Sequence, residues 1–213
     1  NPKIASYELE YQGWWWQHRL RTRISGFFNH VSDLIQFRND TGIPTNPSRP
    51  VNGGVADIYG AEAGFEWLAT SWLSGFANYS YQEAGQSFQG FSRRAFPHHK
   101  VNAGLRLTWT PAWTGEVLYH HVGATSYPLA DAFTLLSPFL QPGTAVPQER
   151  VRSYNLLNLR LGYRLWQEQV SEGYLREAEI AVSVFNALND THREHPVGDI
   201  LGSRVMGWLT VRY

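Results

Sequence analysis

Residues 157–165 read LNLRLGYRL, and this stretch alternates apolar and polar side chains without a break. Leucine or tyrosine occupies every odd position, whereas asparagine, arginine or glycine occupies every even one. Successive side chains of a β-strand point to opposite faces, so the pattern predicts a strand with one apolar and one charged face. A helix would instead repeat its apolar residues three and four positions apart.

The same alternation recurs along the chain, and no segment of comparable length carries a helical apolar stripe. It predicts nine strands, at about 4–13, 18–35, 56–68, 73–82, 100–110, 114–122, 153–166, 177–187 and 203–213. The 213 residues are enough for one large domain or two modest ones. We therefore expect an all-β, antiparallel protein.

The connections between these strands alternate in length. Four are compact, at 13–17, 69–72, 111–113 and 167–176, and four are long and polar, at about 36–55, 83–99, 123–152 and 187–202. Short turns at one end and long loops at the other are typical of an up-and-down transmembrane β-barrel of the outer membrane. A soluble sandwich gives no reason for this asymmetry.

The tryptophans indicate where such a barrel would meet the membrane surface. Eight of the nine flank the predicted short turns, namely Trp14, Trp15, Trp16, Trp67, Trp72, Trp109, Trp113 and Trp166. Tryptophan favours the headgroup level, where its apolar body and its N–H group both find suitable surroundings. These eight are therefore predicted to form a membrane-interface girdle. The alternative is that they pack the core of a soluble protein.

The polar positions of the strands carry charges of both signs, namely Glu8, Glu10, Glu62, Glu66, Arg21, Arg23, Arg106, Arg160, Arg164 and Arg212. Unpaired charges are costly in hydrocarbon, so these residues are predicted to line a lumen, although the solvated face of a soluble sheet is the alternative. Closed bacterial barrels have an even number of strands and both termini on the periplasmic side. Nine strands that end at the short-turn side do not meet this condition, so residues 1–213 are expected to be the C-terminal part of a larger barrel.

Composition excludes several other classes of protein. The 18 basic and 18 acidic residues balance, so a nucleic-acid partner is not expected. No apolar run approaches the ~18 residues of a membrane helix. Cysteine is absent, and the eight histidines lack the spacing of a closed zinc site, so neither a metal nor a cofactor is expected. No catalytic constellation occurs, and the chain is not expected to be an enzyme.

Short motifs in a fixed order carry a family resemblance. They are SYELEYQG at 6–13, ISGFFNHVSDLI at 24–35, NGG at 52–54 with YGAE at 59–62, the series Arg94, Pro97, His98 and Lys100, and SY at 153–154 with LRLGY at 159–163 and FNALN at 185–189. This series resembles the β-barrel of TonB-dependent outer-membrane receptors. The end of the chain is similar to the signal read by the barrel-assembly machinery, with Leu209, Val211 and Tyr213 in the alternate apolar positions and tyrosine in place of the commoner phenylalanine.

The resemblance implies a barrel of roughly 22 strands whose lumen is closed by a plug. The plug, the segment that contacts TonB and the N-terminal strands match nothing in the chain. The implied function is binding of a scarce nutrient at the surface of the bacterial outer membrane, and its import with energy from the TonB complex. A ferric siderophore is the first expectation, with cobalamin or heme behind it. The implied partners are membrane lipid, lipopolysaccharide, TonB, the assembly machinery and a small metal chelate.

Ligand capture is expected in the long loops. Arg93 and Arg94 are candidates to pair with an anionic chelate. Tyr127, Phe133 and Phe139 offer apolar surface for a large ligand, and His192 is a further candidate. The alternative is that these residues only order the loops or face lipopolysaccharide. Two other functions remain open at this point, a passive porin-like channel and a soluble β-rich carbohydrate-binding module.

Overall fold

The computed structural model describes residues 2–38, 49–88, 91–92, 96–127, 150–171 and 174–213, and within these ranges every regular element is a β-strand. The strands are β1 (Lys3–Trp15), β2 (Leu20–Arg38), β3 (Arg49–Leu68), β4 (Leu73–Phe88), β5 (Phe91–Ser92), β6 (His99–Leu107), β7 (Trp113–Val122), β8 (Thr125–Ser126), β9 (Arg150–Val151), β10 (Tyr154–Ser171), β11 (Tyr174–Phe185) and β12 (Arg204–Arg212). Among the described residues there is no helix long and apolar enough to cross a membrane.

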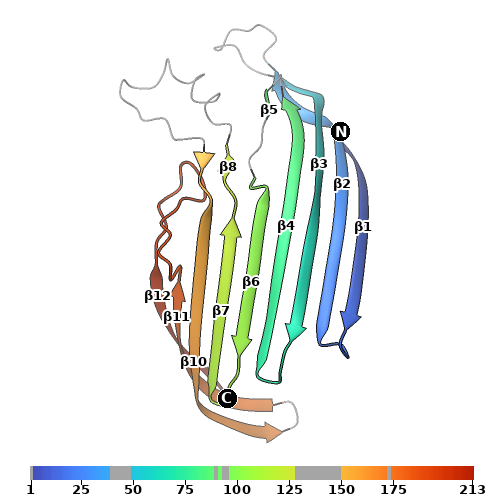
Figure 1. The fold of residues 1–213 in the computed structure, drawn as a ribbon. Helices are drawn as coiled ribbons and strands as arrows, with labels where there is room; N and C mark the ends of the chain where they lie inside the picture. The colour runs from blue at the N-terminus through green and yellow to red at the C-terminus, as the bar shows by residue number, and fades with distance from the viewer. Residues whose placement is uncertain (1, 39–48, 89–90, 93–95, 128–149, 172–173) are drawn as a thin grey trace, which may run out of the picture.

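Nine strands pair in the order β1-β2-β3-β4-β6-β7-β10-β11-β12, each antiparallel to the next. The short strand β5 pairs with β4, and β8 pairs with β9 in a separate two-stranded sheet. The long strands run up and down side by side, with tight turns at one end and longer connections at the other (Figure 1). The predicted all-β antiparallel fold is confirmed, and β1 and β12 are the two edges of an open wall.

Several strands are longer than the sequence predicts. β3 begins at Arg49 rather than near residue 56, and β4 continues to Phe88 rather than ending near 82. The compact connection predicted at 167–176 is shorter still, because β10 and β11 stay paired as far as Ser171 and Tyr174. Backbone pairing needs no alternation of side chains, so strands can continue where both faces meet water.

The register aligns the residues of each face in rows across the sheet. One row contains Trp15, Leu20, Trp67, Gly75, Leu105, Val117, Leu159, Val184 and Val205. The adjacent row contains Trp14, Arg21, Glu66, Phe76, Gly104, Leu118 and Asn158. Since side chains alternate, these rows lie on opposite faces, which we call the apolar face and the charged face.

The apolar face is not covered by a second layer of the described chain. Leu9 is 80% exposed and Leu209 is 69% exposed, and among the described residues no large side chain is fully buried. A soluble sandwich would bury such rows against its other sheet. The face therefore requires another apolar phase to cover it.

The aromatic residues of the apolar face mark a band of constant height. Tyr7 and Trp15 bound residues 7–15 of β1, Tyr59 and Trp67 bound 59–67 of β3, and His121 and Trp113 bound 113–121 of β7. Each segment contains nine residues. A membrane-spanning strand needs about 9–11 residues, so the band between the rings has the height of a bilayer.

The turn between β1 and β2 holds bulky residues in a left-handed backbone conformation. Trp16, Gln17 and His18 all have positive φ, at 49°, 56° and 66°. The N–H of Arg19 donates to the carbonyl oxygen of Trp16 at 3.1 Å and closes the turn. Left-handed residues are common in two-residue and related hairpin turns because their twist matches that of the strands.

Candidate functional site

Ion pairs between neighbouring strands run across the charged face. They are Arg23–Glu10 at 3.1 Å, Arg21–Glu66 at 3.4 Å, Arg106–Glu116 at 3.0 Å, Arg160–Glu179 at 2.5 Å, Arg212–Glu177 at 2.7 Å and Arg164–Glu177 at 3.6 Å. These pairs include all of the predicted lumen charges except Glu8 and Glu62. Their partners Glu116, Glu177 and Glu179 were not predicted, because only the register shows which carboxylate lies beside which arginine.

The Arg160–Glu179 pair depends on a glycine beside it. A Cβ atom at Gly162 would lie 3.0 Å from the Oε1 atom of Glu179 and 2.6 Å from the Oγ1 atom of Thr114. The absent side chain thus leaves room for Glu179 to reach Arg160 across the strand. Both charged side chains are largely shielded, at 32% and 20% exposed.

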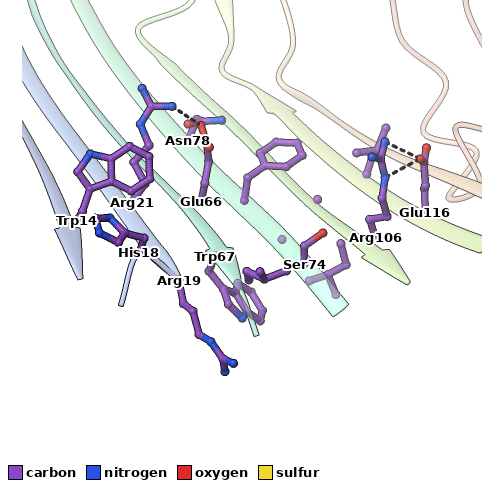
Figure 2. A pocket seen from close by; sticks show the side chains of 16 residues that line it. Trp14, His18, Arg19, Arg21, Glu66, Trp67, Ser74, Asn78, Arg106 and Glu116 are labelled. Carbon is purple, nitrogen blue, oxygen red and sulfur yellow. Dashed lines mark hydrogen bonds and ion pairs between the residues drawn. The ribbon is translucent and has the colours of Figure 1, made fainter. Parts of the chain in front are cut away.

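A hollow of about 660 Å³ lies on the charged face towards the short turns. Arg21 and Glu66 lie on one side of it, and Arg106 and Glu116 on the other (Figure 2). The apolar residues Phe76 and Leu118 contribute to the lining between these two ion pairs. The wall is therefore amphipathic here, and could contact a mixed polar and apolar surface inside a lumen.

Seven of the predicted girdle tryptophans lie at the short-turn side of the sheet or in its turns. Trp15 and Trp67 share one apolar row, and Trp113 packs against Tyr163 with ring centroids 4.7 Å apart. A Cβ atom on Gly75 would lie 2.9 Å from the Trp67 ring, and one on Gly115 would lie 3.1 Å from the Trp109 ring. The other members, Trp16, Trp72 and Trp166, are 75%, 46% and 42% exposed.

Trp14 does not fit the predicted girdle. It pairs with Arg21 on the charged face, and its ring lies 5.4 Å from the Arg21 guanidinium carbon. The prediction is corrected for this residue, because alternation places Trp14 on the same face as Glu8 and Glu10. The ninth tryptophan, Trp208, also faces the charged side and borders a smaller hollow with Arg160.

A second set of rings on the apolar face was missed by the sequence analysis. This loop-side row comprises Tyr7, Phe28, Tyr59, Tyr79, Tyr81, His99, Tyr119 and His121. The Tyr79 hydroxyl lies 2.8 Å from Nδ1 of His99, and the Tyr119 hydroxyl donates to Asn155 at 2.7 Å. These residues are scattered singly along the chain and occupy several neighbouring levels of the register, so only the pairing of the strands brings them to one part of the sheet.

The segment between β11 and β12 is fixed to β10 by an ordered network. Asn186 and Asn189 have positive φ, a conformation that asparagine tolerates well, and the side chain of Asn186 hydrogen-bonds the backbone N–H and carbonyl of Asp190. The Asp190 carboxylate accepts from Arg152 at 2.6 Å and from the N–H of Asn155 at 2.8 Å. These two bonds hold the pKa of Asp190 below its ordinary value, against the opposing effect of burial.

Two of the predicted ligand-binding residues meet in this loop cluster. His192 is only 4% exposed, and its ring stacks on Tyr154 with centroids 4.0 Å apart. Tyr127 donates its hydroxyl to the carbonyl oxygen of Glu194 at 3.1 Å, and its ring lies 4.7 Å from that of His195. As the loop is folded here, both side chains are engaged in holding it, and His192 offers no open ring face to a large ligand.

The remaining predicted ligand contacts, Arg93, Arg94, Phe133 and Phe139, lie outside the described residues. The predicted assembly signal lies on the edge strand, where Leu209 and Val211 pair with Ile180 and Ala178 on the apolar face. Tyr213 follows β12 and is 86% exposed. In the part of the chain that the structure describes, no group of three or more His, Asp or Glu side chains could hold a metal ion.

The low pKa of Asp190 predicts how the loop responds to acid. A carboxylate with a lowered folded-state pKa stabilises the fold above its ordinary value, and this contribution is lost as pH falls through the folded value. Backbone protection around residues 186–192, that is hydrogen exchange corrected for its intrinsic pH dependence, should therefore fall below about pH 4. Asp190→Asn should show fast exchange already at neutral pH and a flatter response to acid. An unchanged pH profile in this variant would contradict the assignment.

Comparison with known proteins places this architecture in a family. A single transmembrane wall with one apolar and one ion-paired face defines the class as a β-barrel membrane protein. The model of the family "TonB dependent receptor-like, beta-barrel" matches residues 3–187, and the chain belongs to this family. Members of this family are transporters and not enzymes. The alternative of a soluble sugar-binding module is therefore set aside.

Solved structures of receptors share the fold at low sequence identity. The pyoverdine outer-membrane receptor FpvA of Pseudomonas aeruginosa, bound to pyoverdine, is 15% identical with a TM-score of 0.70, over 98% of this chain and 29% of the receptor. The ferric yersiniabactin uptake receptor FyuA of Yersinia pestis is 18% identical with a TM-score of 0.64, over 98% and 28%. The ferric-catecholate import receptor Fiu of E. coli is 13% identical with a TM-score of 0.65, over 97% and 28%. No curated protein matches the chain. The chain thus spans less than a third of the length of these receptors.

Proposed function

We propose that this chain is the C-terminal part of the barrel of an outer-membrane receptor that imports a ferric siderophore with energy from the TonB complex. The observation that carries the proposal is the nine-stranded wall with one lipid-like and one ion-paired face, in a chain of the TonB-dependent receptor family. Several of its structural neighbours are siderophore receptors by name. A plug domain and the remaining strands would complete the working receptor.

The two aromatic levels give this wall its place in the membrane. The tryptophans near the short turns would lie at the periplasmic headgroups, and the loop-side row of tyrosines and histidines would lie at the outer leaflet among lipopolysaccharide. The strands that continue beyond this row, β3 and β4, would then extend above the membrane. Leu209, Val211 and Tyr213 would present the edge strand to the barrel-assembly machinery.

The charged face carries an exposed lysine at its loop end. Lys100 lies there exposed, in a row with Ser80 and Val122, and His120 lies one level below with its Nδ1 atom 2.5 Å from Asn102. Ferric siderophores that carry carboxylate or phenolate groups would meet these donors on entering the lumen. Arg93 and Arg94 are proposed as earlier contacts of the same chemistry.

Uptake of radioactive iron by cells tests the proposed function. The full-length protein that carries this chain is expressed in a strain without its own siderophore receptors, and ferric catecholate, hydroxamate and mixed chelates are compared with heme and cobalamin. We expect uptake of one ferric chelate that disappears when TonB is deleted. Uptake that persists without TonB would identify a passive channel, and uptake of heme or cobalamin alone would overturn the siderophore assignment.

A further inference from the structure

The ring of His192 is fixed in the way that is usual for a histidine that binds a metal. Its Nδ1 atom lies 2.8 Å from the carbonyl oxygen of Asp190, so Nδ1 carries the proton and donates it. The Nε2 atom then keeps a free lone pair. Histidines that bind metals are usually fixed in this way, by a second-shell acceptor on the nitrogen that does not bind.

The free lone pair is buried and has no hydrogen-bond partner among the described residues. The side chain of His192 is only 2% exposed, and an unsatisfied buried acceptor is rare in folded proteins. The nearest acid is Glu194, whose Oε1 atom lies 3.7 Å from Nε2. This separation is too long for a hydrogen bond. It suits one ion with bonds of ~2.0–2.2 Å to each atom.

The charges around the pair favour a cation. Asp190 is already neutralised by Arg152, and Arg193 points its guanidinium to the carbonyl oxygen of Pro196 at 3.2 Å. No arginine or lysine is paired with Glu194 in the described structure. The Glu194 side chain is 58% exposed, so a hydrated ion can reach its carboxylate from solvent.

We propose that His192 and Glu194 bind a divalent transition-metal ion through Nε2 and the carboxylate. Imidazole with carboxylate suits Zn²⁺ and Cu²⁺, and Cu²⁺ is the tighter of the two in the usual affinity order. Two protein ligands leave positions for water or for donors of an arriving chelate, so the site is weaker than a closed four-ligand site. The bound ion joins two positions of the loop 186–203, one of which, His192, stacks on Tyr154, and it does not depend on which nutrient the receptor imports.

Copper binding to the full-length protein in detergent tests this site. At neutral pH the wild type should bind one equivalent of Cu²⁺ with the electron paramagnetic resonance signature of an imidazole nitrogen, and excess Zn²⁺ should displace it. Glu194→Gln should lower the affinity by at least about 10-fold, the smallest loss expected when even an outer-shell partner is removed. This variant is preferred because its side chain is exposed and its fold should persist, as heat-modified electrophoresis can verify.

A neighbouring histidine provides the matched control. His195→Gln lies three residues from His192 and should bind Cu²⁺ as the wild type does, whereas His192→Gln should lose the nitrogen signature. Equal binding by wild type and Glu194→Gln would overturn the proposal. So would the absence of binding by the wild type. A loop that tightens on acidification without any metal would show a protonated ion pair in place of the metal site.

Discussion

Val117→Arg should destabilise the folded barrel wall by about 2–4 kcal/mol and lower its folded yield in the outer membrane. Val117 lies in the middle of the nine-residue band of β7, on the apolar face between Leu105 and Leu159. An arginine facing lipid at the midplane of a transmembrane barrel destabilises it by about 2–4 kcal/mol. Since proteins commonly have only ~5–15 kcal/mol of stability, this is a large fraction. The measurement is the heat-modifiable folded fraction of the full-length protein in outer-membrane preparations.

Leu118→Arg is the control for this experiment. Leu118 is the next residue of β7, has a similar apolar side chain, and borders the hollow on the charged face with Glu116. An arginine there meets water and a carboxylate, so folding should remain close to that of the wild type. If both variants fold equally well or equally badly, the assignment of the two faces to lipid and lumen is wrong.

Sequence alone could predict the faces because they follow from a local property. Alternation within LNLRLGYRL places Leu159 and Arg160 on opposite sides whatever else the chain does. Strand ends were less predictable. β10 and β11 continue beyond Trp166, where neither face needs to be apolar, and only their mutual hydrogen bonds mark the extension.

Contacts between distant residues account for the remaining differences. The burial of His192 comes from Tyr154, which lies 38 positions earlier in the chain, and no local pattern indicates it. The row of tyrosines and histidines at the loop side is likewise produced by register. Trp14 differs, because strict alternation from Glu8 and Glu10 already points to the charged face. The girdle prediction for Trp14 relied on its position beside a short turn, which is weaker evidence than the alternation.

Glu179→Gln should weaken the barrel wall by about 1–3 kcal/mol, the usual effect of leaving a charged hydrogen-bonding group without its partner in a shielded site. Glu179 binds Arg160 at 2.5 Å, and one guanidinium nitrogen of Arg160 is already buried without a partner. Loss of the carboxylate leaves a shielded positive charge close to Gly162, which has no side chain to pair with it. Urea unfolding of the full-length protein in lipid vesicles measures the change.

Asp33→Asn is the control for Glu179→Gln. Asp33 pairs with Lys3 at 3.7 Å, and the two side chains are 44% and 79% exposed, so this surface pair should contribute only about 0–1 kcal/mol. Both variants remove one carboxylate from one ion pair between adjacent strands. A difference between their unfolding free energies therefore reports how well each pair is shielded from water. Equal losses of unfolding free energy would mean that the charged face is as open to water as the sheet edge. The ion pairs of the charged face would then not be what stabilises the wall.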